Sequence, residues 1–421
     1  MVGADIAWML VAVALVLLMT PGVAFFYGGM VPAKSVVSTK FQSFACIGVV
    51  GLLWAVCGYS LVFTGSDDDY GFIGNLTHAF LAGVGMEPNP AYGSTIPHVL
   101  FMLFQCTFAI ITPALITGAV AERVRFKAWI VIMAAWSLMV YVPVAHWVWG
   151  PGGWIFKMGG LVVHMTSGYA ALIAAMMLGN RAAFRPDEHN NSFSVLLVML
   201  GGTMLWFGWF GFNAGSALAA NGLAGHAAAT TFFAAATAMT VWMVMDWLLS
   251  GKPSAVGAMV GAVAGLVAIT PAAGFVTVQA ALAIGAITAV ICNYACKMVK
   301  QKLKTDDTVD VFACHGVGGT VGTILTAVFA TKTVNPAGAD GLLYGGTDLM
   351  YANVIGALAV ISYTIAMTAF ILYGVGKVMR VRVSPQDEES GLDVTQHGER
   401  AFVVKRPPLT TITTPKKASN G

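Results

Sequence analysis

The sequence predicts an all-α polytopic membrane protein with eleven transmembrane helices: an inverted repeat of spans 1–5 and 6–10, plus a peripheral span 11. Three observations favour this class. The chain of 421 residues is 57% hydrophobic and only 10% charged, whereas a soluble domain carries about 25% charged residues. Its mean hydropathy is +0.77. Its lysines and arginines gather in alternate connections between long apolar stretches.

A helix that crosses the hydrocarbon core needs about 20 apolar residues. The apolar stretches lie near Ile6–Met30, Phe41–Phe63, Ile96–Val120, Ala128–Trp147, Leu161–Leu178, Phe193–Phe212, Ala227–Leu249, Ala255–Ala273, Phe275–Cys296, Val309–Ala330 and Leu349–Val375. The segment "TPAAGF" supplies the proline and glycine that separate the eighth from the ninth. The first stretch has no basic segment before it, which favours a first span over a cleaved signal peptide.

The positive charges predict the orientation. If the N-terminus is outside, every lysine and arginine except Lys157 and Lys332 falls on the cytoplasmic side, as the positive-inside rule requires. An odd number of spans then places the C-terminus inside. We therefore expect a multi-pass protein of the cell (inner or plasma) membrane, with residues 1–383 as its membrane domain and residues 384–421 as a cytoplasmic tail.

All six cysteines fall inside apolar stretches, where a cysteine usually acts as a small buried hydrophobic residue. The sequence contains no zinc or haem-attachment spacing. It also offers no nucleophile–base set. We therefore expect no metal or other cofactor and no enzyme activity.

Two histidines occupy corresponding places in the two predicted halves. His164 in "LVVHMTSG" follows the start of span 5, and His315 in "VFACHGVGG" follows the start of span 10. Since five is odd, these spans run in opposite directions, and inverted repeats place their substrate site at the repeat interface near mid-membrane. An intramembrane ionisable residue is costly and marks a pathway. The pair is therefore predicted to line a pore.

Two other uses of the histidines have to be considered. A single histidine in a span often serves only as a hydrogen-bonding residue between helices, and a pair can ligate haem. The matching placement of the two argues against the first use. The second would need further histidines deep in neighbouring spans, whereas His146 lies at a predicted membrane edge.

Aromatic residues accompany the histidines. Phe104 and Phe108 lie one helical turn apart in span 3, and span 6 ends in the glycine- and aromatic-rich "WFGWFGFNAGS". Trp147 and Trp149 lie at the outer end of span 4, where Trp147 is typical of an interfacial aromatic belt. Together these residues indicate an outer vestibule whose aromatic faces hold a small cation, above an apolar constriction.

Several motifs resemble those of the ammonium transporter (Amt/Mep/Rh) family in its bacterial-type Amt branch. They are "TPGVAFFYGGMV", "AERVRFKAW", "AHWVWG", "VVHMTSG", "GWFGFNAGS", "GKPS", "DVFACHGVGGTVG" and the tail motif "GLDVTQHGERAF". The resemblance covers almost the whole chain. It implies an eleven-span inverted repeat that assembles as a homotrimer with one pore in each subunit.

The resemblance also implies roles for individual residues. Phe108, Trp149 and Ser216 match the external ammonium recruitment site. Phe108 and Phe212 match a stacked phenyl gate below it, and His164 and His315 match the twin histidines that line the pore. The tail is expected to fold against the cytoplasmic face, with Asp387–Glu389 facing the basic loops at Lys297–Lys304 and "AERVRFK". A PII-type signal protein is the expected partner there.

One departure from the family pattern concerns the vestibule. The family usually has an Asp-x-Ala-Gly-Gly segment before the first histidine motif, whereas this chain reads "WGPGGWIFKMGGLVVH" from Trp149 to His164 without an acidic residue. A carboxylate there would cap span 5 and attract cations. Its absence, with Lys157 close by, predicts weaker or altered ammonium recruitment.

Two functions are compatible with these features. The first is a transporter that recruits ammonium, deprotonates it and passes ammonia through the pore, because a hydrated cation cannot cross an apolar constriction cheaply. Methylammonium is a further candidate cargo, and the imidazoles could relay the proton. The alternative is a non-conducting ammonium sensor or receptor on the same scaffold. Transport is the preferred interpretation.

Overall fold

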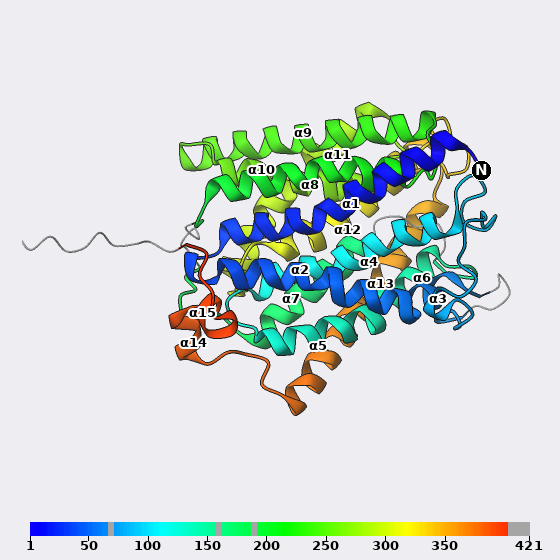
Figure 1. Ribbon diagram of the computed structural model, residues 1–421. Helices are drawn as coiled ribbons and strands as arrows, with labels where there is room; N and C mark the ends of the chain where they lie inside the picture. Colours follow the sequence, from blue (N-terminus) through cyan, green and yellow to red (C-terminus); the bar gives the residue numbers. More distant parts are fainter. Residues whose placement is uncertain (66–70, 156–160, 187–191, 403–421) are drawn as a thin grey trace, which may run out of the picture.

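The computed structural model describes residues 1–65, 71–155, 161–186 and 192–402, which form a single bundle of helices (Figure 1). Within these residues β structure is limited to two isolated bridges. The α-helices are α1 (Gly3–Met30), α2 (Val36–Leu53), α3 (Tyr59–Phe63), α4 (His98–Val120), α5 (Phe126–Trp136), α6 (Val142–Trp149), α7 (Thr166–Leu178), α8 (Val195–Gly215), α9 (Gly222–Ser250), α10 (Ala255–Ile269), α11 (Val278–Lys297), α12 (Gly318–Phe329), α13 (Asp348–Val378), α14 (Pro385–Ser390) and α15 (Leu392–His397).

The predicted spans are confirmed. The described residues contain ten helical segments long and apolar enough to cross a membrane, and the shorter apolar helix α10 makes an eleventh. Several spans include a five- or six-residue π-helical piece: η2 (Trp54–Gly58), η4 (Ser137–Tyr141), η5 (Leu161–Met165), η6 (Met298–Lys302) and η7 (Phe312–Val317). The chain is therefore a multi-pass membrane protein.

The two five-span halves meet through equivalent helices. The first helix of each half, α1 and α8, form the most extensive contact between helices in the bundle. The fifth spans meet through η5 and η7. Helix α13 lies outside the repeat, against α5, α7 and α12. This arrangement agrees with the predicted inverted repeat and peripheral eleventh span.

Small residues allow α1 and α8 to approach closely. A side chain at Gly201 would overlap the backbone of Phe26, and one at Gly211 would lie 2.8 Å from the carbonyl oxygen of Ala12. Between membrane helices, small residues at the contact let van der Waals packing and backbone proximity stabilise association. The two halves are thus joined along the whole length of these helices.

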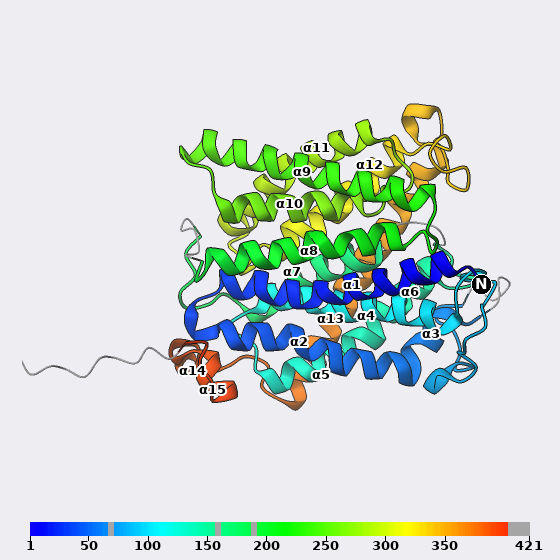
Figure 2. The ribbon, with the colours of Figure 1, turned by 45° about the horizontal axis from the view of Figure 1, so that its top comes forward.

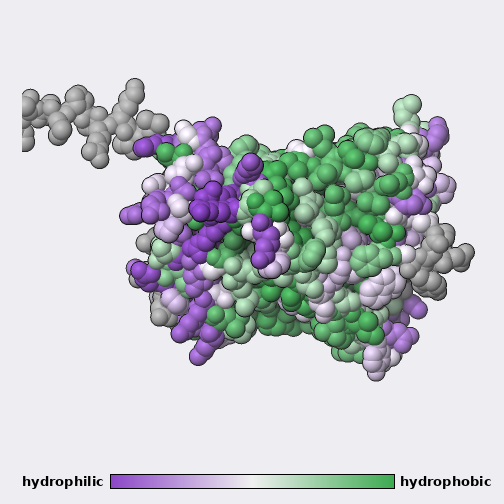
Figure 3. Space-filling view, turned by 90° about the horizontal axis from the view of Figure 1, so that it is seen from below, coloured by the Kyte–Doolittle hydropathy of each residue, from purple (hydrophilic) through white to green (hydrophobic). Residues whose placement is uncertain are grey.

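The two ends of the bundle differ. We call the end that carries Met1 the N-terminal end, and the opposite end, which carries α14 and α15, the tail end (Figures 1 and 2). An apolar band separates hydrophilic residues at the two ends, and the hydrophilic surface is more extensive at the tail end (Figure 3). This pattern is typical of a protein that spans a bilayer.

The tail is tied to the tail end by backbone hydrogen bonds. After α13 a strap of residues 379–384 pairs with the loop before α5: the N–H of Arg125 donates to Val381 at 2.9 Å, and the N–H of Val383 donates to Arg123 at 2.8 Å. Ser384 then caps α14 in a capping box with Asp387.

Two buried carboxylates anchor the short helices of the tail. Glu388 accepts from the N–H of Ala182 at 2.6 Å and pairs with Arg382 at 3.0 Å. Asp393, 1% exposed, accepts from the N–H of Ser38 at 2.8 Å. Lys34 donates to the carbonyl oxygens of Glu388 and Glu389.

The docking surface therefore differs in part from the expected one. The tail meets the "AERVRFK" loop as expected, but its other described hydrogen bonds go to residues 34–38 and 178–182 rather than to Lys297–Lys304. Asp387 caps its own helix instead of facing a basic side chain. Backbone N–H groups, which sequence charge does not reveal, take the place of the expected ion pairs.

Beneath the tail lies a buried ion network. Asp306, with a fully buried side chain, accepts hydrogen bonds from the backbone N–H, Nε and Nη2 of Arg181 at 2.8–2.9 Å. Arg181 also pairs with Glu122, and Arg123 Nη1 lies 3.6 Å from Asp306. The network connects the loops after α4 and α7 to the segment before η7. It thus fixes the base of the helix that carries His315.

Candidate functional site

Five aromatic rings follow one another into the core of the bundle. Ring centroids are 6.1 Å apart between Trp149 and Phe108, 4.7 Å between Phe108 and Phe212, 5.7 Å between Phe212 and His164, and 5.4 Å between His164 and His315. These rings come from α6, α4, α8, η5 and η7, so both halves of the repeat contribute. The structure therefore brings these sequence-predicted site residues into one continuous series.

The phenyl pair lies directly beside the histidine pair, with Phe212 next to His164. The Phe108 and Phe212 rings are both buried, and their planes make an angle of 77°. The rings thus meet edge to face, a favoured aromatic geometry, and not in the parallel stack that the family pattern implied. Phe104 packs edge-on against Phe108 at 4.8 Å and supports it from behind.

Trp149 and Ser216 lie on the side of the phenyl pair that faces the N-terminal end. Ser216 follows directly after α8, whose last turns contact the start of α1: Trp8 donates to the carbonyl oxygen of Ala214, and Asp5 accepts from the N–H of Ala220. Ser216 is an exposed residue, and its hydroxyl donates to the carbonyl oxygen of Phe212 at 2.7 Å. Its oxygen can still accept a hydrogen bond from a cation, because a hydroxyl has two lone pairs.

His164 and His315 face each other below the phenyl pair. Their Nδ1 atoms are 3.3 Å apart, so one imidazole donates and the other accepts. The side chains are almost fully buried. The Nε2 atom of His164 has no hydrogen-bond partner in the described structure. An unpartnered buried nitrogen in an apolar wall is a site where a small polar solute can bind.

Local backbone structure explains how two histidines from opposite halves come so close. Both lie in π-helical pieces, η5 and η7, and α7 packs directly on η7. At the crossing, a Cβ on Gly168 would overlap the backbone nitrogen and Cα of Gly316 and lie 2.7 Å from the carbonyl carbon of His315. Only a glycine at position 168 allows this approach.

A narrow cavity adjoins the histidine pair. It has room for roughly one water-sized molecule. Apart from the two imidazoles, the hydroxyl of Tyr27 and the indole N–H of Trp209, the side chains that line it are apolar. The lining comprises Met19, Val23, Phe26, Tyr27, Ile111, Leu115, Val163, His164, Leu205, Trp209, Phe212, Val263 and His315. A neutral solute the size of ammonia fits such a space, whereas a hydrated cation does not.

The sequence left two residues of this site unassigned. Trp209 stacks at 5.4 Å on His164 and at 5.5 Å on Phe212, and Tyr27 lines the cavity with a buried hydroxyl that has no partner in the described structure. The i, i+3 spacing of Trp209 and Phe212 on one helix was the available signal. Trp147 is not a lipid-facing belt residue, because it is buried and donates to the carbonyl oxygen of Phe72.

Part of the segment that departs from the family pattern, residues 156–160, lies outside the described residues. The family's acidic residue is expected either at Phe156 or in a short block lost between Lys157 and Leu161, and both places fall within these residues. The predicted effect on recruitment therefore stays a prediction. Within the described part of the chain, no group of three or more His, Cys, Asp or Glu side chains could hold a metal ion.

Comparisons with known proteins agree with this geometry. The model of the Ammonium Transporter Family matches residues 7–402. An ammonium transporter of Bacillus subtilis is 45% identical over 404 residues, covering 94% of this chain and 98% of its own. The crystal structure of Candida albicans Mep2 superimposes with a TM-score of 0.85 at 35% identity, over 92% of this chain and 88% of that one. A structure described as a sensor Amt protein gives 0.84 at 30% identity, over 94% and 98%.

Proposed function

The chain belongs to the ammonium transporter family and carries ammonium or ammonia across a membrane, and we propose that it does so along the ring series from Trp149 to His315. The single observation that carries this proposal is the buried pair of imidazoles 3.3 Å apart beside an otherwise apolar cavity. Phe108, Trp149 and Ser216 recruit the cation, and Phe108 with Phe212 forms the gate. His164 and His315 then offer the hydrogen bonds that ammonia needs in transit.

The chemistry follows from the cost of moving charge. The faces of Trp149 and Phe108 and the Ser216 oxygen stabilise a small cation outside the gate. Beyond the gate an ammonium ion would have to leave its water for an apolar wall, which is far more costly than passage of neutral ammonia. Deprotonation before the gate therefore selects against monovalent metal ions such as potassium, which have no proton to lose.

The placement in the cell is part of the proposal. Lysine and arginine are concentrated at the tail end, where Lys34, Arg123, Arg181, Lys300 and Arg382 are found. The positive-inside rule then puts the tail end in the cytoplasm and the N-terminus outside the cell membrane. Assembly as a homotrimer, with one pore in each subunit, is the expected quaternary state.

Replacing either histidine tests the proposed path. His164→Ala and His315→Ala should each lower ammonium-dependent current or methylammonium uptake in liposomes about tenfold, or admit potassium, because ammonia loses a hydrogen-bond partner inside the cavity. The matched control is His226→Ala, which removes a half-buried histidine bonded to Val276 outside the ring series. Its flux should equal that of the wild type.

The same assay separates transport from sensing. If liposomes that contain the wild-type protein show saturable ammonium binding but no ammonium-dependent flux, the protein is a sensor and not a transporter. Wild-type flux and selectivity in both histidine variants would instead refute the path through the pair.

The tail is proposed as a regulatory segment, from residue 384 onward, that a PII-type signal protein engages. Deleting everything after Val383 removes α14, α15 and the buried anchors Glu388 and Asp393, so transport and PII binding should both change. Deleting only the residues after Phe402 leaves the anchors in place and should change neither. Equal behaviour of the two truncations in flux and pull-down assays would show that the docked helices have no regulatory role.

A further inference from the structure

One buried carboxylate at the N-terminal end of the bundle takes no direct part in the ring series. Asp5 lies in the first turn of α1 and is buried. It accepts one hydrogen bond from the backbone N–H of Ala220 at 2.9 Å and another from the hydroxyl of Thr95. An ionised carboxylate only accepts, and hydrogen bonds to it are stronger than bonds between neutral groups. Asp5 thus joins three segments that lie far apart in the sequence.

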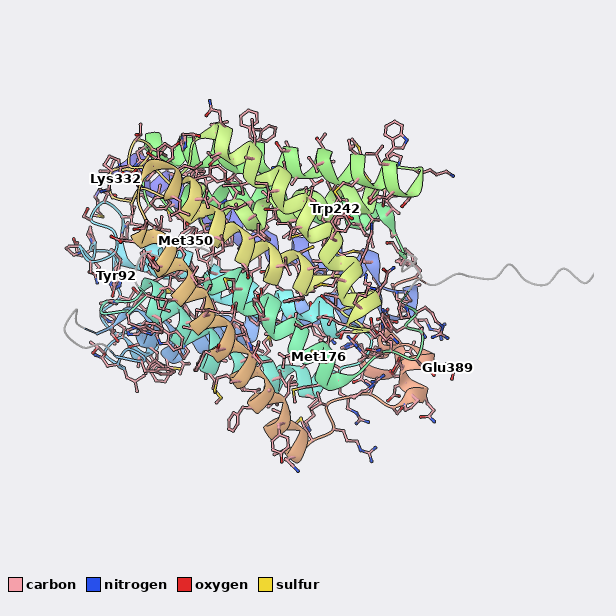
Figure 4. All side chains as sticks on the ribbon, turned by 180° about the vertical axis from the view of Figure 1, so that it is seen from behind. Tyr92, Met176, Trp242, Lys332, Met350 and Glu389 are labelled. Carbon is pink, nitrogen blue, oxygen red and sulfur yellow. The ribbon has the colours of Figure 1, made fainter. Side chains whose placement is uncertain are left out.

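The two partners of Asp5 adjoin the helices that carry the phenyl pair. Thr95 lies three residues before α4, which carries one ring of the pair, and Ala220 lies five residues after α8, which carries the other. Figure 4 shows Tyr92, in the same loop as Thr95, at the end of the bundle opposite Glu389. Asp5 therefore connects α4 and α8 at the N-terminal end, on the vestibule side of the phenyl pair.

The bond to Ala220 also fixes the segment that carries Ser216. Residues 216–221 separate α8 from α9 and form a tight turn closed by backbone hydrogen bonds. Leu218 in this turn has φ 54°, in the left-handed region that a residue other than glycine occupies only where the surrounding structure holds it there. Four residues of chain span at most about 14 Å even when extended, so Asp5 holds the turn close to the Ser216 hydroxyl.

A purely local role for Asp5 would be to stabilise the first turn of α1, where a negative charge is favourable. Asp348 has the corresponding position in the first turn of α13. The two residues differ in their surroundings, because Asp348 is exposed, whereas Asp5 is buried and binds donors from two segments outside its own helix. A local role explains the position of Asp5 but not these two donors.

We propose that Asp5 is a positioning residue for cation recruitment: by joining the segment before α4 to the turn after α8, it sets the Ser216 oxygen relative to the Phe108 ring. The inference rests on the proposed recruitment of the cation by Phe108, Trp149 and Ser216. The cation contacts the rings and the hydroxyl, and Asp5 acts through them. Since the chain has no acidic residue between Trp149 and His164, the placement of these neutral groups determines the affinity, and a displacement of about 1 Å weakens it.

The test measures how ammonium-dependent current depends on ammonium concentration in liposomes that contain the full-length protein. Asp5→Ala removes the acceptor, so KM should rise about fivefold. The maximal current should stay close to that of the wild type, because only binding outside the gate is weakened. Asp5→Asn keeps an oxygen that accepts from Ala220 and should restore most of the wild-type affinity. Thr95→Val removes one of the two donors at nearly constant shape and should raise KM by a smaller factor than Asp5→Ala.

The matched control is Asp348→Ala, which removes an acidic residue from the first turn of a helix outside the ring series. Its KM should equal that of the wild type, and melting temperatures of the same preparations separate a loss of stability from a loss of affinity. An unchanged KM in Asp5→Ala, or an equal rise in Asp348→Ala, would overturn the positioning role. A lower maximal current at unchanged KM would also overturn it and leave Asp5 as a structural anchor of α1.

A double-mutant cycle with Ser216→Ala separates this inference from the proposed function. If Asp5 acts through Ser216, Asp5→Ala should add less than about twofold to the KM of Ser216→Ala, because groups that act together give non-additive effects. Full additivity would overturn the action through Ser216. A raised KM in Ser216→Ala with a wild-type KM in Asp5→Ala would overturn the inference alone. A wild-type KM in both single variants would refute the recruiting role of the hydroxyl as well.

Discussion

Replacing Gly168 with alanine is expected to reduce ammonium flux to less than a tenth of the wild-type value and to destabilise the protein by about 3 kcal/mol or more. The new Cβ would overlap the backbone of Gly316, one residue after His315. Overpacking against side chains typically costs about 1–3 kcal/mol. Here the obstacle is backbone, which has no rotamer to change, so α7 and η7 must separate and the imidazoles with them.

A second glycine provides the control. A Cβ on Gly48, in the middle of α2, would meet no other atom within 4 Å. Gly48→Ala should therefore stabilise the helix by about 0.5–1 kcal/mol and leave flux unchanged. Flux in liposomes and melting temperature, measured on the same preparations, check both variants. Wild-type flux in Gly168→Ala would mean that the contact between the histidines is not needed for conduction.

Asp306→Asn is expected to lower the free energy of unfolding by about 3–5 kcal/mol, because it leaves Arg123 and Arg181 buried with only Glu122 to compensate them. Burial alone would raise the pKa of Asp306, but hydrogen bonds and charge from Arg181, together with Arg123, hold that pKa below its usual value. For Arg123 burial has the opposite direction and lowers the pKa of the guanidinium to about 10. Burial thus disfavours the charged form of both residues, and an uncompensated cation is costly at this site.

The lowered pKa of Asp306 gives the sign of the pH dependence of stability. Because the pKa of Asp306 is lower in the folded state, its stabilisation is present above the unfolded pKa of about 3.9 and is lost as pH falls through the folded pKa. The acid side of a melting-temperature profile should accordingly be flatter in Asp306→Asn than in the wild type. Parallel profiles would show that this carboxylate does not supply the acid-side stability.

The comparison variant is Asp310→Asn. Asp310 pairs with Lys300 at 2.7 Å, and both side chains are about 20% exposed. Partly solvated pairs contribute about 1 kcal/mol or less. Asparagine also tolerates the left-handed backbone of this position, where φ is 63°. A loss equal to that in Asp306→Asn would contradict the role given to burial.

Hydropathy was sufficient to predict the membrane spans because the bilayer imposes a length and an apolar composition on each. The predicted end of the fifth span, Leu178, is the last residue of α7. Where a span begins with glycines and a histidine, as α9 does between Gly222 and His226, hydropathy placed its start several residues late. The paired histidines were predicted from their matching positions, since the topology of the repeat alone brings them together.

Other features leave little trace in a single sequence. The charges of Glu122 and Arg181 resemble those of any cytoplasmic loop, and only the fold shows that they are buried with Asp306. The tail docks through backbone N–H groups, which every residue except proline carries, so the residue types do not reveal this contact. The edge-to-face angle of Phe108 and Phe212 depends on how α4 and α8 are placed relative to each other. These are properties of distances between segments, which composition and periodicity do not encode.

His164 and His315 lie in π-helical turns, so the direction of each imidazole depends on the number of residues in its turn. A π turn holds more residues than the 3.6 of an α-helical turn. Removing one residue from Phe312–Val317 would let the piece revert to regular α-helix while the flanking helix keeps its register, so the residues inside the piece, His315 among them, would change direction. Insertions and deletions in these two short segments are therefore more damaging than most substitutions. When sequences of such proteins are aligned, a gap placed there would imply a different pore.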